Sequence, residues 1–194
     1  PDYSRVTMTG GEPLVFKGFK EVFSYAIKRF PCNIITNGLL LTEEKIDYFL
    51  SFQNFRVLSI SIDDIGDKLR GISQKDWSNL EKKMIYFNKQ KREINSKCNL
   101  DVKTMILDEN AENLFDIHKY FIEKIGINTH SFQFLKGSPI QHSDKMFHLD
   151  DILEKSKAYV YKNFEIIQEQ LNLIRGYDKK NNLNSYLHPK IVSL

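Results

Sequence analysis

The sequence predicts an α/β fold of parallel βα units curved into an open or closed barrel with its helices outside. Two observations carry this prediction. Short apolar and β-branched runs recur five times, and amphipathic helical patterns separate them. No repeat or low-complexity linker interrupts the alternation, so one parallel sheet accounts for all five runs.

The five runs have the composition of strands. The first, Val6 to Thr9, leads directly into two glycines, and the second, Cys32 to Gly38, closes with the turn dipeptide Asn-Gly. The others are residues 56–64, 100–107 and 130–135. Parallel strands require long crossovers, which the intervening helices supply.

Cap signals locate three of these helices. Thr42 precedes two glutamates whose carboxylates suit the positive end of a helix dipole, and Ser73 is followed three residues later by Asp76. Asn110 is expected to cap a further helix, which Gly126 ends. Each helix directs one apolar stripe toward the sheet.

We expect residues 1–139 to form the barrel-like domain and residues 140–194 a C-terminal extension that opens with a polar loop. Within the extension, Asp151 to Ile174 has the apolar periodicity of a long amphipathic helix. Gly176 to Asn184 has the composition of a surface loop or a fraying tail.

The composition excludes several classes of protein. With 194 residues, 41% of them apolar, and a net charge of +3, the chain is globular and shows no footprint for nucleic acid. No apolar run approaches the roughly 18 residues of a membrane span, so we expect no membrane insertion. Cys32 and Cys98 form neither a disulfide framework nor a CxxC metal-binding knuckle. We therefore expect a cytoplasmic location and two buried free thiols.

The third strand alternates strictly between apolar and polar residues. Its members divide into an apolar set, Leu58, Ile60 and Ile62, and a polar set, Ser59, Ser61 and Asp63. The apolar set is expected to face the helices, which leaves the polar set inside the barrel. Barrel interiors normally hold branched apolar residues, so this face indicates a binding site. A half-exposed edge strand gives the same alternation, although mostly in antiparallel sheets.

The candidate binding residues lie on the inner faces and at the carboxyl ends of the strands, where barrels of this kind carry their functional groups. They are Gly10, Gly11, Glu12, Thr36, Asn37, Ser59, Ser61, Asp63, Lys103 and Gln133. Because the sequence contains no GxxxxGK phosphate-binding loop, this set of residues suits a polar, ribose-bearing ligand better than a polyphosphate. The two glycines permit close backbone approach, although a plain Gly-Gly-x-Pro turn explains the same residues.

Four short motifs, taken together in this order, resemble the radical S-adenosylmethionine (radical SAM) enzymes, in particular the branch that modifies peptides and other unusual substrates. They are MTGGEPL at 8–14, ITNG at 35–38, SISIDD at 59–64 and DKLRGI at 67–72. The resemblance covers roughly residues 4–139. It implies a partial (β/α)6 barrel of the TIM type in which strands two to six are present and the first is missing.

The resemblance also implies ligands and an activity. The Gly-Gly-Glu-Pro turn of the family receives the amino group of S-adenosylmethionine, here through backbone carbonyls near Gly10 and Gly11 together with Glu12. Ser61 would meet the ribose. Three apolar residues would flank the adenine: Met105, Leu107 and Leu135. The implied reaction cleaves S-adenosylmethionine reductively to a 5′-deoxyadenosyl radical that abstracts hydrogen from a peptide or a small molecule. An electron donor such as flavodoxin or ferredoxin is the implied partner.

One family feature has no counterpart in these residues. The family holds a 4Fe–4S cluster on a CxxxCxxC loop, and Cys32 and Cys98 match neither that spacing nor its place before the Gly-Gly turn. We expect the loop to lie upstream of Pro1 in a parent enzyme, which leaves these 194 residues inactive alone. The alternative is a cluster-less, non-catalytic βα-barrel module that binds a nucleoside-like ligand.

Overall fold

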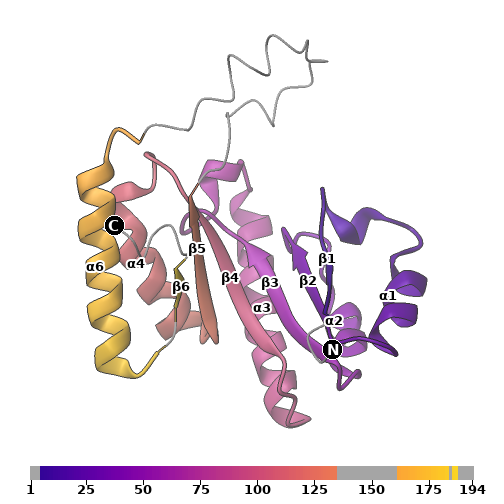
Figure 1. Cartoon of the computed structure of the whole chain (residues 1–194). Helices are drawn as coiled ribbons and strands as arrows, with labels where there is room; N and C mark the ends of the chain where they lie inside the picture. The colour runs from indigo at the N-terminus through magenta and orange to yellow at the C-terminus, as the bar shows by residue number, and fades with distance from the viewer. Residues whose placement is uncertain (1–4, 135–160, 184, 188–194) are drawn as a thin grey trace.

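The computed structural model describes residues 5–134, 161–183 and 185–187. One sheet runs through them, and all neighbouring strands pair in parallel in the order β1-β2-β3-β4-β5-β6 (Figure 1). The strands are β1 (Val6–Met8), β2 (Cys32–Thr36), β3 (Phe55–Ser61), β4 (Asn99–Ile106), β5 (Thr129–Phe134) and β6 (Tyr186–Leu187). The predicted α/β architecture is confirmed.

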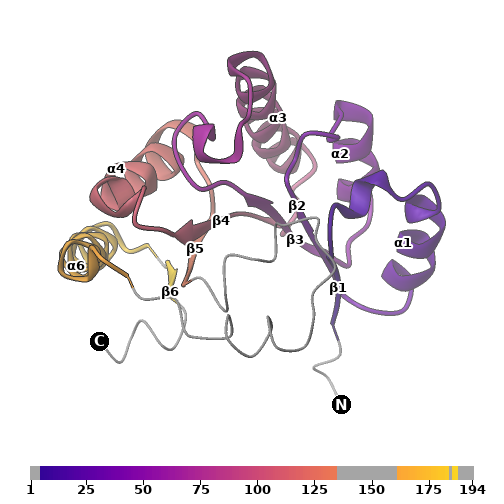
Figure 2. The same ribbon diagram turned by 90° about the horizontal axis from the view of Figure 1, so that it is seen from above.

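The helices lie along the outer side of a curved, open sheet (Figure 2). They are α1 (Phe19–Ile27), α2 (Glu43–Leu50), α3 (Gln74–Glu93), α4 (Leu114–Lys119) and α6 (Phe164–Asn181), with a π-helical turn η4 (Tyr120–Ile125) continuing α4. Short 3-10 turns follow three strands: η1 (Pro13–Val15), η2 (Lys68–Arg70) and η3 (Ala111–Asn113). Among the described strands β1 and β6 have one neighbour each, so the barrel is partial.

The division of β3 into two faces is confirmed. Leu58, Ile60 and Ile62 are fully buried in the main core, where Leu80 and Met84 of α3 also lie. Burial of each such side chain stabilises the fold by about 1.5–3 kcal/mol. The apolar face of β3 therefore packs against the helices, and its polar face lies on the inner, concave side of the curved sheet.

Two of the predicted helix caps and one predicted helix end are confirmed. The Thr42 hydroxyl accepts a hydrogen bond from the Lys45 amide (3.2 Å), and the Ser73 hydroxyl accepts one from the Asp76 amide (3.1 Å). Gly126 ends η4 with a φ of 75°, a left-handed conformation that glycine adopts without steric cost. These caps fix where α2 and α3 begin relative to the strands before them.

The prediction that Asn110 caps a helix is correct for its position, since η3 begins directly after it, but wrong for its side chain, which makes no cap hydrogen bond. Its amide nitrogen donates to the carbonyls of Asp63 (2.7 Å) and Met105 (2.8 Å), and its side-chain oxygen accepts from the Leu107 amide (2.9 Å). The side chain is committed to the ends of β3 and β4 and makes no cap to η3. Asn110 therefore holds these two strand ends together.

The C-terminal prediction is partly wrong. Residues 161–163 are not helical, and α6 begins at Phe164 and continues through residues 176–181, where a loop was expected. Buried Ile174 and Asp178 flank Gly176, and their contacts outweigh the roughly 1 kcal/mol that a mid-helix glycine costs. The sequence also gave no sign of the short β6. The expected domain boundary at 139/140 and the expected helix over 151–160 fall outside the described residues.

Candidate functional site

A pocket of about 790 Å³ opens at the carboxyl ends of the strands. Four of the predicted binding residues line it, namely Ser61, Asp63, Lys103 and Gln133. The remaining lining residues are Thr9, Ile35, Leu69, Arg70, Thr104, Met105 and Leu107. Met105 and Leu107 are two of the apolar residues expected beside adenine; the third, Leu135, lies outside the described residues.

The Gly-Gly turn leaves open space beside its backbone. Gly10 and Gly11 have φ values of 97° and 51°, which side-chain-bearing residues rarely adopt. A Cβ atom added to either glycine would meet no heavy atom within 4 Å. The turn follows Thr9, which lines the pocket, so its backbone is accessible next to that pocket.

Glu12 holds this turn against the end of β2. Its Oε1 accepts from the Thr36 hydroxyl (2.7 Å) and the Leu14 amide (3.0 Å), and its Oε2 accepts from the Asn37 amide (2.7 Å). Thr36 is only 2% exposed, and its hydroxyl also accepts from the Gly38 amide. Glu12, Thr36 and Asn37 therefore form one hydrogen-bonded group that is not among the lining residues of the pocket.

Ser59 contacts the buried carboxylate of Asp101, a residue that the sequence analysis did not identify. The Ser59 hydroxyl donates to Asp101 Oδ2 (2.8 Å), and the hydroxyls of Thr129 and Ser131 donate to Asp101 Oδ1 (2.8 Å each). The Lys103 ammonium lies 3.8 Å from Asp101 Oδ2. The alternation that placed Lys103 on the inner face of β4 places Asp101 there too, and this was the available signal.

The charged groups at the rim centre on Asp63. Its Oδ1 accepts from the Met105 amide (2.9 Å), and the Arg70 guanidinium lies 3.9 Å from its Oδ2. Burial raises the pKa of Asp63, and it raises the pKa of the fully buried Asp67, beneath Arg70, to about 6. Arg70 was not predicted, although it stands in the DKLRGI motif. With Arg70 beside Asp63 and Lys103 also among the lining residues, the pocket offers both signs of charge, as a zwitterionic ligand requires.

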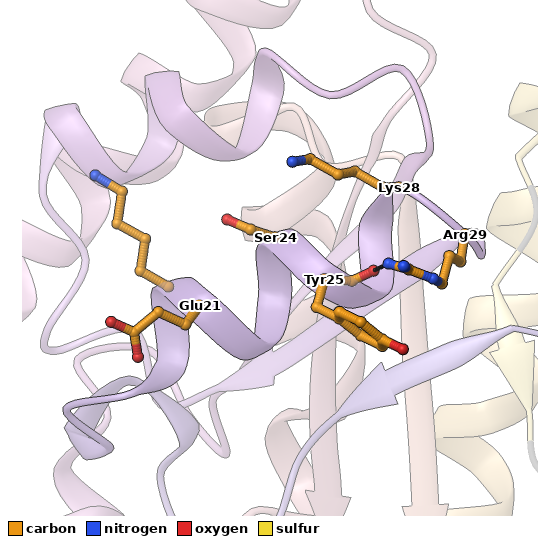
Figure 3. A pocket seen from close by; sticks show the side chains of 6 residues that line it. Glu21, Ser24, Tyr25, Lys28 and Arg29 are labelled. Carbon is orange, nitrogen blue, oxygen red and sulfur yellow. Dashed lines mark hydrogen bonds between the residues drawn. The ribbon is translucent and has the colours of Figure 1, made fainter.

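A second hollow, of about 590 Å³, lies on α1 (Figure 3). Side chains of α1 and of Lys28 and Arg29 directly after it line this hollow, and Arg29 folds back to donate to the Tyr25 carbonyl (3.0 Å). It contains none of the predicted binding residues and lies away from the strand ends, so it is a surface groove.

The part of the chain that the structure describes contains no group of three or more His, Cys, Asp or Glu side chains placed to hold a metal ion. Both cysteines are buried, and burial raises the pKa of Cys32 and raises that of Cys98 to about 12. Among the described helices, none has the length and apolar character needed to cross a membrane.

Comparison with known proteins assigns a family. The family model described as the Radical SAM superfamily matches residues 1–121. No curated protein matches the sequence.

Solved structures share the fold at low sequence identity. SuiB from Streptococcus suis is 14% identical, with a TM-score of 0.65 over 95% of this chain and 38% of that one. Two structures of anSMEcpe, one with bound AdoMet and one with AdoMet and the Cp18Cys peptide, are each 15% identical, with TM-scores of 0.65 and 0.66. They cover 96% of this chain and 48% and 50% of theirs, so the chain spans half or less of these proteins. Since the family model covers more than half of it, the chain belongs to the radical SAM superfamily.

Proposed function

We propose that this chain is the S-adenosylmethionine-binding part of a radical SAM enzyme, and that the pocket at the strand ends binds the cofactor. The observation that carries the proposal is that four polar residues on or just after three neighbouring strands converge on one pocket next to the Gly-Gly turn: Ser61, Asp63, Lys103 and Gln133. AdoMet bound to structures of the same fold supports it.

We assign roles to the chain's own residues on this basis. The carbonyls near Gly10 and Gly11 accept hydrogen bonds from the cofactor's amino group, because their surroundings are open, and Glu12 keeps the turn in place. Ser61 binds the ribose, and Met105 packs against the adenine. When bound and reduced by one electron from outside these residues, S-adenosylmethionine would supply the 5′-deoxyadenosyl radical for hydrogen abstraction from the substrate. Lys103 and Asp63 orient the charged end of the ligand.

The cysteines of this chain do not fit a 4Fe–4S cluster. Cys32 on β2 and Cys98 before β4 are buried, and a raised pKa disfavours the thiolate that iron requires. We therefore propose that cluster ligands come from outside these 194 residues, which alone do not cleave S-adenosylmethionine. The same misfit favours the second candidate function, a cluster-less module that binds a nucleoside-like ligand in this pocket.

The partners follow from the enzyme proposal. One anSMEcpe structure has both AdoMet and the Cp18Cys peptide bound, which supports a peptide as the substrate class here, with a small molecule as the other option. An electron donor such as flavodoxin or ferredoxin, and a cytoplasmic location, complete the proposal.

Titration calorimetry with S-adenosylmethionine tests the binding site. Ser61→Ala is expected to weaken binding by roughly threefold to tenfold, the worth of one hydrogen bond, whereas Ser78→Ala on α3 leaves the affinity unchanged. Equal affinities for the two variants would place the ligand elsewhere. Anaerobic reconstitution with iron and sulfide then separates the two functions: the 194 residues should remain colourless, and a full-length protein that also stays colourless would favour the module.

A further inference from the structure

Three unfavourable features occur together at Asp67. The residue is fully buried, and burial raises the pKa of its carboxyl group to about 6. Its backbone has a φ of 48°, a left-handed conformation that residues other than glycine seldom adopt. Its Oδ2 atom is buried and accepts no hydrogen bond from the residues that the structure describes. Because such features gather at functional sites, we looked for a function of Asp67.

Asp67 folds the loop after β3 back toward that strand. Its carbonyl accepts from the amides of Arg70 and Ile72 (3.2 Å each). Its Oδ1 atom accepts from the Asp63 amide (3.2 Å). The turn η2 follows Asp67 directly, and Arg70 is the last residue of η2. These contacts bring the Arg70 side chain back to the end of β3.

The Arg70 guanidinium lies between this buried carboxylate and the candidate pocket. Its Nη1 atom lies 3.7 Å from Asp67 Oδ2 and donates to the Ser61 carbonyl. Its Nε atom lies 3.9 Å from Asp63 Oδ2. Arg70, Ser61 and Asp63 line the pocket, whereas Asp67 is not among the lining residues. An effect of Asp67 on a ligand must therefore pass through its neighbours, and Arg70 is the one of opposite charge.

Fixing Arg70 in advance favours ligand binding. An arginine side chain that moves among many rotamers must be immobilised when a ligand contacts it, which weakens binding. A charged Asp67 immobilises Arg70 before the ligand arrives, and this charge is little screened because water does not reach it. The guanidinium carries five N–H groups, so after donating to Ser61 it retains donors for an anionic group of a ligand.

We propose that Asp67 is a positioning residue for this pocket: its charged carboxylate fixes the Arg70 guanidinium beside Ser61 and Asp63, where it can donate to an anionic group of the ligand. The proposal rests on the proposed function only in taking S-adenosylmethionine, whose carboxylate is such a group, as the ligand. The buried charge lowers the stability of the fold, and the preformed position of Arg70 is the functional reason for keeping it.

The groups around Asp67 decide at which pH it carries its charge. Among the described residues, the charged groups that act on it are Arg70, Asp63 and Asp64. Burial has the largest effect and raises the pKa of Asp67 to about 6; the Asp63 amide and Arg70 lower this pKa, and the two neighbouring carboxylates raise it. Asp67 is therefore expected to hold Arg70 above about pH 6 and to release it at lower pH.

Nuclear magnetic resonance of the ¹⁵N-arginine-labelled protein tests the positioning without any ligand. The Nε signal of Arg70 is identified by its absence from Arg70→Lys. Its order parameter is expected to be high at about pH 7.5 and clearly lower at about pH 5, where Asp67 is neutral. Asp67→Asn should show the lower value at both pH values. An order parameter that is the same at both pH values in the unmodified protein overturns the proposal.

Calorimetry with S-adenosylmethionine tests the effect on the pocket. At about pH 8, Asp67→Asn is expected to bind the ligand roughly twofold to tenfold more weakly than the unmodified protein, the effect of immobilising one long side chain. At about pH 5 the two proteins should bind equally, because Asp67 is then neutral. The ratio of the two affinities cancels the titration of the ligand itself and should rise with a midpoint near pH 6. A ratio that does not change with pH overturns the proposal.

A double-mutant cycle separates positioning from a structural role of Asp67 in the loop. In an Arg70→Gln background, Asp67→Asn should cause no further loss of affinity, whereas a structural role predicts that the two losses add. Additive losses overturn the proposal.

Asp64→Asn is the matched control. It removes a carboxylate from the same loop, and this carboxylate accepts from the Leu69 amide (3.3 Å). Its affinity should stay within about twofold of that of the unmodified protein. A loss as large as that of Asp67→Asn would indicate a general effect of charge and overturn the positioning role. A protein that binds no S-adenosylmethionine at any pH contradicts the proposed function, while the order parameter of Arg70 still decides the positioning role.

Discussion

The Thr36 hydroxyl donates to Glu12 Oε1 over 2.7 Å and so ties the end of β2 to the turn that follows β1. The other carboxylate oxygen takes the Asn37 amide. Both oxygens of Glu12 are therefore occupied by the protein itself, and the acid of the Gly-Gly-Glu-Pro motif acts here as a connector between two strand exits.

Glu12→Gln is expected to lower the free energy of unfolding by about 1–3 kcal/mol, because the new amide group faces a donor whichever way it turns. Urea denaturation of this variant and of Glu21→Gln, which changes an exposed acid on α1, measures the difference. Equal stability of the two variants would contradict the connector role.

Gly38→Ala is expected to destabilise the fold by about 2–4 kcal/mol, combining overpacking with a left-handed backbone. Gly38 has a φ of 76°, and an added Cβ would lie 2.5 Å from Leu80 Cδ1 and 3.1 Å from Ile60 Cγ2. Gly71→Ala is the matched control, since its φ is 71° and its Cβ would meet nothing within 4 Å. Thermal unfolding should show the larger loss for Gly38→Ala, and equal losses would mean that packing at this position is loose.

Asp67→Asn is expected to stabilise the protein above pH 6. The folded-state pKa is raised to about 6 by burial, so the native state holds a proton that the unfolded state releases near pH 4, and stability falls between these values. Asparagine also tolerates the φ of 48° at this position.

The gain is expected to reach about 1–3 kcal/mol at pH 8 and to disappear near pH 4, where Asp67 is itself neutral. Denaturation at both pH values, with the exposed Asp116→Asn as the control, measures it. A gain that is the same at pH 4 and pH 8 would rule out charge burial as its cause.

Gly11→Val is expected to weaken S-adenosylmethionine binding at least tenfold, because a β-branched side chain would fill the space beside the turn and resist its φ of 51°. Calorimetry of this variant is compared with Gly126→Val, which strains a glycine of similar φ at the end of η4. Unchanged affinity of a folded Gly11→Val protein would show that the turn is only structural.

The sequence predicted those features of the fold that depend on local composition and on the periodicity of apolar residues. Alternation in the third strand separated Ile60 from Ser61 correctly, and the same period led to Lys103 and Gln133, which the fold brings to one pocket. The roles of these residues toward a ligand stay predictions. What the sequence predicted well is therefore the arrangement of the strands and of the faces they present.

Side chains whose partners lie far along the chain could not be predicted. Asn110 is a residue type that commonly caps helices, but its side-chain amide donates to the Asp63 carbonyl, 47 residues away. The helix α6 continues beyond Gly176 because Asp178 meets His118, 60 residues away. In both cases a tertiary hydrogen bond outweighs a local propensity of about 1 kcal/mol.

The position of α6 restricts how this chain can be divided. Three residues of α6 complete a second hydrophobic cluster with Ile106, Leu114 and Phe132; they are Ile167, Leu171 and Ile174. These three α6 residues lie beyond residue 121, where the family-model match ends. A deletion that stops at residue 121, where the matched segment ends, would remove β5 as well as α6 and expose the apolar side of α4 and Ile106 of β4 to water. Shortened or chimeric versions of this protein must keep α6 with the sheet, because the homologous segment and the folding unit have different boundaries.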